Sequence, residues 1–85
     1  MKYASAGTLE SNDCLITVHP NDNIDIIIES IVFDAFGAQI EAVIREVLSI
    51  EKVKGLKVHI KDKGALDYTI KARLITALKR LEAKR

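Results

Sequence analysis

Apolar and polar residues alternate along three short stretches of the chain. In residues 14–19, 24–29 and 56–61 every second residue is apolar, beginning with the first. A period of two places successive side chains on opposite faces, which is typical of a β-strand with one buried face. Residues 20–23, Pro-Asn-Asp-Asn, have the composition of a turn. The first two stretches are therefore predicted to form a hairpin.

The spacing changes to that of a helix in two longer segments. Apolar residues three or four positions apart form one stripe between 33 and 47 and another between 66 and 81, as expected for helices that bury one face. Ser30 is the predicted N-cap of the first helix, because its hydroxyl can accept a hydrogen bond from an unpaired amide. The end of the second helix is basic, which complements the helix dipole and could also bind phosphate. These basic residues are Lys79, Arg80, Lys84 and Arg85.

The predicted order of elements is β-β-α-β-α. We expect an α+β fold, a two-layer sandwich in which both helices cover one face of a three-stranded, mainly antiparallel sheet. The preferred sheet order places strand 14–19 in the middle, and the alternative places strand 24–29 there. Residues 1–10 are small and polar and are predicted to form a flexible arm, while residues 11–85 form a single domain.

Composition excludes several functional classes. A chain of 85 residues has little room for its own catalytic cleft. Thirteen basic and twelve acidic residues give a net charge of +1, which argues against a dedicated binder of nucleic acid or of anionic membranes. The single cysteine, Cys14, excludes a disulfide within the chain and a cysteine-rich zinc site. The N-terminal sequence lacks the apolar run of a signal peptide, so a cytoplasmic location is expected.

The candidate metal ligands and the candidate thiol nucleophile have plain structural explanations. His19 and His59 are expected on the open face of the sheet, where Asp25 or Glu29 would have to supply a third metal ligand. Polar residues on a solvated face explain the same pattern, and we favour that interpretation. Cys14 points inward, so it is expected to be a small buried hydrophobe rather than a nucleophile.

Two other combinations of residues involve the same strands. Ser11, His19 and Asp13 could form a catalytic triad on paper, but nothing resembles a nucleophile elbow, and strand geometry separates them. Leu15 and Ile27 are apolar and are predicted on the open face. They are either part of a docking patch or incidentally exposed.

Residues 11–13, Ser-Asn-Asp, have the composition of an exposed turn that leads into a strand. The Ser11 hydroxyl is thus accessible to a modifying enzyme. On exposure alone, Ser5 and Thr8 are equally eligible.

Two segments resemble a known family. AGTLESND (6–13) and DKGALDYTIKARLITALKRL (62–81) are similar to the N-terminal and C-terminal signatures of the acyl carrier subunit, the γ chain, of citrate lyase. The segment from Phe36-Gly37 to Lys54-Gly55 also fits this family. The resemblance covers essentially the whole chain.

This resemblance implies a function for the turn. Ser11 would carry phosphoribosyl-dephospho-coenzyme A (phosphoribosyl-dephospho-CoA) through a phosphodiester. The terminal thiol of that arm would carry acetyl and citryl thioesters while citrate is cleaved to oxaloacetate and acetate. The implied partners are the α (acyl transferase) and β (citryl lyase) subunits and the transferase that attaches the prosthetic group. The chain itself would be a non-catalytic carrier that needs no metal and binds neither nucleic acid nor membrane.

Two alternatives remain open. The carrier subunit of malonate decarboxylase uses the same type of prosthetic group, although the GTLES and DKGALD matches favour citrate lyase. A small α/β interaction module without a cofactor could bind RNA through its open sheet. Few aromatic residues and a nearly neutral charge argue against RNA binding.

Overall fold

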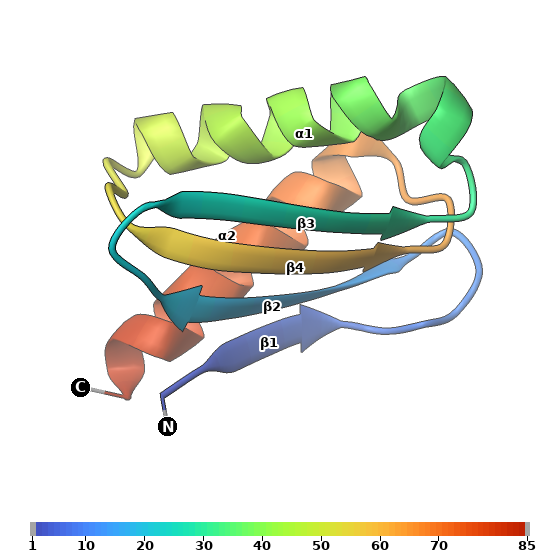
Figure 1. Cartoon of the computed structure of the whole chain (residues 1–85). Coiled ribbons are helices and arrows are strands. Elements are labelled where there is room, and N and C mark those ends of the chain that lie inside the picture. The colour runs from blue at the N-terminus through green and yellow to red at the C-terminus, as the bar shows by residue number, and fades with distance from the viewer. Residues whose placement is uncertain (1, 85) are drawn as a thin grey trace.

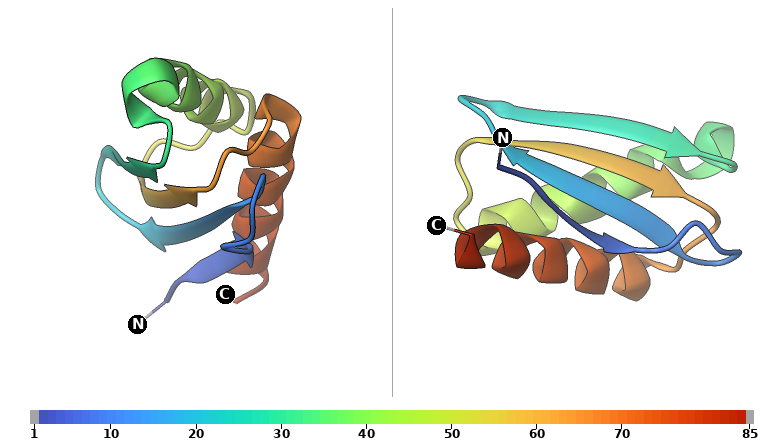
Figure 2. Two further views of the ribbon diagram at one scale, coloured as in Figure 1. Left: turned by 90° about the vertical axis from the view of Figure 1, so that its right-hand side faces the viewer. Right: turned by 90° about the horizontal axis from the view of Figure 1, so that it is seen from below.

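The chain folds into a mixed four-stranded sheet covered on one face by two helices. The computed structural model describes residues 2–84 (Figure 1). Its elements are β1 (Ala4–Gly7), β2 (Cys14–Pro20), β3 (Ile24–Ser30), α1 (Phe33–Ile50), β4 (Leu56–Asp62) and α2 (Asp67–Ala83). Figure 2 shows both helices on the same side of the sheet, as predicted for an α+β sandwich. No helix of the described chain is both long and apolar enough to cross a membrane.

The prediction of three strands and a flexible N-terminal arm is wrong for residues 4–7. They form β1, which pairs with β2 in antiparallel register from Ala4 opposite Val18 to Gly7 opposite Leu15. Ala4 and Ala6 are buried beneath α2. The sequence of this strand gives no strand pattern, because alanine, serine and glycine lack the β-branched and aromatic side chains that are enriched in strands.

The predicted hairpin and both predicted sheet orders are also wrong. The order is β1-β2-β4-β3, so β4 lies between β2 and β3. It is antiparallel to β2, with Cys14 opposite Asp62, and parallel to β3, with Ile24 opposite Leu56. The inner face of β4 is fully buried, whereas that of β3 is only half-buried, as expected for a central strand and an edge strand.

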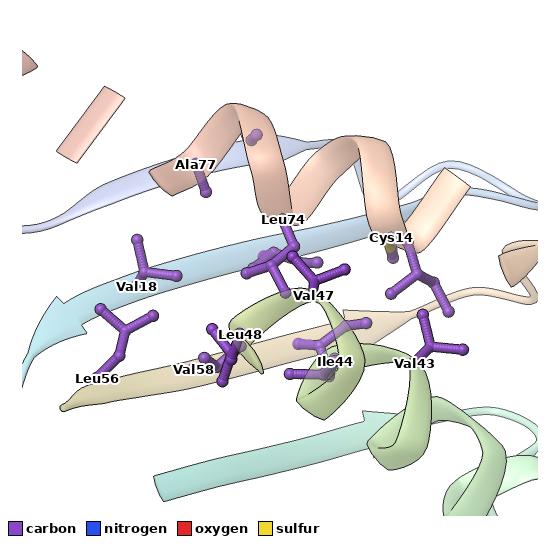
Figure 3. Close-up of a cluster of buried hydrophobic side chains, with 14 of the residues drawn as sticks. Cys14, Val18, Val43, Ile44, Val47, Leu48, Leu56, Val58, Leu74 and Ala77 are labelled. Carbon is purple, nitrogen blue, oxygen red and sulfur yellow. The ribbon is translucent and has the colours of Figure 1, made fainter. Parts of the chain in front are cut away.

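The core lies between the sheet and the helices. Figure 3 shows side chains of β2, β4, α1 and α2 meeting there, and Cys14 lies among them. The largest fully buried side chains are Ile16, Ile44, Ile60, Ile70, Leu74, Val18 and Val58. The apolar stripes of both predicted helices are thereby confirmed over most of their length.

The start of α1 differs from the prediction. Ser30 is not its N-cap, because the helix begins at Phe33 and the cap position, Val32, makes no side-chain capping bond. The Ser30 hydroxyl instead accepts a hydrogen bond from the Val32 amide and donates one to Asp62. Phe33 and Phe36, expected on the buried stripe, are about half exposed at 52% and 50%.

Candidate functional site

Ser11 lies at the tip of the loop that joins β1 to β2. The amide of Asp13 donates to the carbonyl of Glu10 at 3.2 Å, which closes a β-turn with Ser11 and Asn12 at its centre. Asn12 has a φ of 64°, and asparagine tolerates this left-handed conformation better than most residues. Ser11 is exposed to solvent on this turn.

The three hydroxyl groups near this loop have different environments. The hydroxyl of Thr8 donates to Asp13 at 2.7 Å and accepts from the amide of Glu10 at 3.2 Å. Ser5 lies within β1 and is only half-exposed. Of these three hydroxyls, that of Ser11 is exposed and makes no hydrogen bond within residues 2–84.

The carboxylate of Asp13 is the centre of the loop's hydrogen bonds. Nε and Nη2 of Arg73, on α2, donate to its two oxygens at 3.0 and 2.7 Å. The amide of Cys14 adds a third donor at 2.7 Å. Hydrogen bonds from Arg73, and then from the Thr8 hydroxyl, stabilise the ionised form and lower the pKa of Asp13 to about 2.

The loop is also joined to the connection between β4 and α2. The amide of Asn12 donates to the carbonyl of Lys63 at 2.8 Å, and the amide of Lys63 donates to the carbonyl of Asp13 at 2.9 Å. That connection is held by buried Asp62, which accepts from the amide of Ala65 at 2.9 Å. Ser11 is therefore exposed on a loop that is anchored to two other parts of the fold.

Exposed apolar side chains lie at the same end of the molecule. The β1–β2 loop, the start of α1 and the β4–α2 connection meet there (Figure 1). A hollow of about 420 Å³ has Leu9, Ile31, Lys61 and Lys63 among its lining residues. A more apolar groove of about 510 Å³ runs between the start of α1 and the start of α2, where Phe36 and Leu66 line it.

The structure gives no support to a metal site on the open face. His59 Nε2 is hydrogen-bonded to the carboxylate of Glu29, a diagonal neighbour on β3, and His19 stacks on Tyr3 with ring centroids 5.6 Å apart. No cluster of three or more metal-ligating side chains occurs among the described residues. His19 and His59 do share the open face, opposite Lys57 and Thr17 of the neighbouring strands.

The triad and the thiol nucleophile also find no support. His19 lies near the far end of β2 from Ser11, and Asp13 is bound by Arg73 rather than by a histidine. Cys14 is fully buried, and burial, followed by the nearby charge of Asp13, raises the pKa of its thiol to about 12. A thiol with that pKa stays protonated at neutral pH and is a poor nucleophile.

Leu15 and Ile27 do not form a continuous apolar patch. They lie on the two strands that flank β4. Leu15, on β2, is opposite Lys61, and Ile27, on β3, is opposite His59. The central strand thus separates them with a cationic and a polar side chain.

The basic end of α2 contacts the N-terminal strand region. Arg80 donates to the carbonyl of Ser5 at 2.8 Å. Lys84 donates to the carbonyl of Tyr3 at 2.7 Å, with its Nζ 5.2 Å from the centre of the Tyr3 ring. Two of the four basic residues at this end, Arg80 and Lys84, thus make contacts within the fold, and Arg85 lies outside the described residues.

Comparison with known proteins agrees with the resemblance seen in the sequence. A family model described as "Malonate decarboxylase delta subunit (MdcD)" matches residues 1–81. The "Citrate lyase acyl carrier protein" of Treponema denticola is 49% identical over 98% of this chain and 95% of its own length. That of Streptococcus mutans is 52% identical over 91% of this chain and 78% of its own length.

A solved structure shares the fold. A chain of the Pseudomonas malonate decarboxylase hetero-tetramer, crystallised with malonate, matches 94% of this chain with a TM-score of 0.82 and 17% identity, and 84% of that chain is covered. The named relatives are acyl carrier proteins, which supports an acyl carrier role. The chain therefore belongs to the acyl carrier protein family that includes the malonate decarboxylase delta subunit and the citrate lyase acyl carrier proteins.

Proposed function

We propose that this protein is the acyl carrier subunit of a citrate lyase and that its prosthetic group, phosphoribosyl-dephospho-CoA, is attached to Ser11. The observation that carries the proposal is the exposed, uncommitted hydroxyl of Ser11 on an anchored turn. Identities of 49% and 52% to citrate lyase acyl carrier proteins favour citrate lyase among the members of the family.

The residues of the loop suit a phosphodiester linkage. A phosphodiester needs one free hydroxyl with space around it, and Ser11 offers both. The neighbouring hollow is lined by two lysines, Lys61 and Lys63, and by two acidic residues, Glu29 and Asp62, so its formal charges balance. When bound, the group supplies a terminal thiol on a long arm, on which an acyl group is carried as a thioester.

The chain's own contribution is to position the arm and contact partners, not to catalyse. An arm fixed at Ser11 keeps its acyl group at a high local concentration around the α (acyl transferase) and β (citryl lyase) subunits. Leu9, in the same loop as Ser11, and Ile31, across the adjoining hollow, are 51% and 67% exposed and support contact with larger subunits at this end.

Intact-mass analysis of the chain purified from its native host tests the proposal. We expect an added mass equal to the prosthetic group, localised to the peptide that contains Ser11 and absent from Ser11→Ala. Ser49→Ala is the matched control, because Ser49 is also exposed but lies on α1. An unmodified native chain within an active complex would contradict the proposal.

Malonate decarboxylase is the second candidate complex, because the matching family model and a solved structural neighbour carry that name. Reconstitution separates the two. The modified chain should restore citrate cleavage to citrate lyase α and β subunits, and should not restore malonate decarboxylation to malonate decarboxylase subunits that lack their own carrier.

A further inference from the structure

We propose that Asp13, clamped by Arg73, is a positioning residue that presents the Ser11 hydroxyl to the enzyme that modifies it. The inference rests on the proposed function, because it assigns these two residues a role in the modification of Ser11.

The ion pair fixes the carboxylate in one orientation. Two parallel hydrogen bonds, 3.0 and 2.7 Å long, join the planar guanidinium of Arg73 to both oxygens of Asp13. The side chain of Asp13 is only 14% exposed, and that of Arg73 is 39% exposed. A bidentate pair of this kind defines the plane of the carboxylate as well as its place, which a lysine ammonium cannot do.

The fixed carboxylate holds both ends of the loop. Its oxygens accept from the hydroxyl of Thr8, where the loop begins, and from the amide of Cys14, where β2 begins. The Thr8 hydroxyl in turn accepts from the amide of Glu10. The first half of the loop is thus tied to α2 through a chain of side-chain bonds that passes through Asp13.

The second half of the loop is held by backbone bonds. Asn12 and Asp13 pair with Lys63, independently of the Arg73 side chain. Loss of Arg73 should therefore leave the fold and the turn in place while it loosens the segment that precedes Ser11. The expected effect is a local loosening of the loop within a domain that stays folded.

The orientation of the hydroxyl matters for the attachment chemistry. The Ser11 oxygen must bond to the phosphorus of an activated phosphoribosyl donor while the bond from phosphorus to a phosphate leaving group breaks. The leaving group takes the bonding electron pair, and the serine proton passes to a base of the modifying enzyme. A misplacement of about 1 Å in such an alignment can cost roughly a hundredfold in rate.

The test compares Arg73→Ala, Arg73→Lys and Asp13→Asn with the native chain. Arg80→Ala is the matched control, because Arg80 lies on the same helix and donates to β1 but not to the loop. On the unmodified chain, amide hydrogen exchange measured by NMR should become about tenfold faster at Glu10 and Cys14 in Arg73→Ala and Asp13→Asn. Arg80→Ala should leave these two amides unchanged.

Attachment by the modifying enzyme is then followed by intact mass. We expect kcat/KM for the Arg73→Ala chain to fall between about tenfold and a hundredfold, and Arg73→Lys to restore only part of the loss because it lacks the planar fork. Native rates in Arg73→Ala and Asp13→Asn would overturn the positioning role and leave the proposed function intact. A native chain that accepts no group would overturn both.

Discussion

The buried carboxylate of Asp62 accepts a hydrogen bond of 2.8 Å from the hydroxyl of Ser30, which is 32 positions earlier in the chain. The two residues are register partners at the ends of the parallel strands β3 and β4. Asp62 also accepts from the amide of Ala65. This one side chain thus holds together the points at which the chain leaves both strands, directly beside the loop that bears Ser11.

Replacing Asp62 should destabilise the whole domain. Asp62→Ala removes the acceptor of both bonds and leaves the Ala65 amide without that partner, at an expected cost of about 2–4 kcal/mol in the free energy of unfolding. Ser30→Ala should cost only about 1 kcal/mol. Urea denaturation followed by circular dichroism measures both. Asp25→Ala, on the exposed face of β3, is the control, and a cost for Asp62→Ala as small as that of Asp25→Ala would contradict the assignment.

The ion pair between Asp13 and Arg73 should make the stability of the folded chain decrease at low pH. Its pKa is lowered from 3.8 to about 2 in the folded chain, so the unfolded chain binds the proton first as the pH falls. The stabilisation is complete above the unfolded pKa and is lost as the pH falls through the folded pKa. The difference in melting temperature between the native chain and Asp13→Asn should therefore shrink between about pH 4 and pH 2. A difference in melting temperature that stays constant over that range would contradict this prediction.

Cys14 should be unreactive in the folded protein. Its thiol is fully buried, and its pKa is raised to about 12. Alkylation with iodoacetamide at mildly alkaline pH should be very slow without denaturant and fast with it, because unfolding both exposes the thiol and restores its ordinary pKa. Rapid alkylation of the folded chain would show that β2 opens readily at its start.

Two glycines with similar positive φ angles should respond differently to substitution by alanine. Gly7 has a φ of 104° and Gly64 a φ of 91°. A Cβ on Gly7 would lie 1.8 Å from the carbonyl oxygen of Cys14, whereas a Cβ on Gly64 would find its nearest neighbour, Asn12 Oδ1, at 3.7 Å. Gly64→Ala should cost about 1–2 kcal/mol from backbone strain alone. Gly7→Ala should cost clearly more and should disrupt the β1–β2 loop, as measured by thermal unfolding and by NMR shifts in that loop.

Periodicity along the chain was sufficient to predict most elements but not their neighbours. The alternation in β2, β3 and β4 and the helical stripes of α1 and α2 follow directly from which side chains must be buried. Alternation shows which face of a strand is buried and carries no information about which strand lies beside it. The central position of β4 therefore could not be read from the sequence, and the small residues of β1 gave too weak a signal.

The candidate site was only partly accessible to sequence reasoning. Ser11 stood out through the segment AGTLESND, and the structure places it on an exposed turn. The contact between Asp13 and Arg73 spans 60 positions, and no local pattern predicts a partner at that separation. The sequence does single out the region of Arg73, because this residue lies within the second of the two segments that resemble the carrier family.

The sheet order has a consequence for how the chain can fold as it is synthesised. β4 fills the gap between β2 and β3 although it follows both of them and the whole of α1. Until residues 56–62 leave the ribosome, β3 has no partner strand and only the β1–β2 pair can form. The order of synthesis therefore makes insertion of β4 a late step in folding, after which β3 and α1 can close over the core.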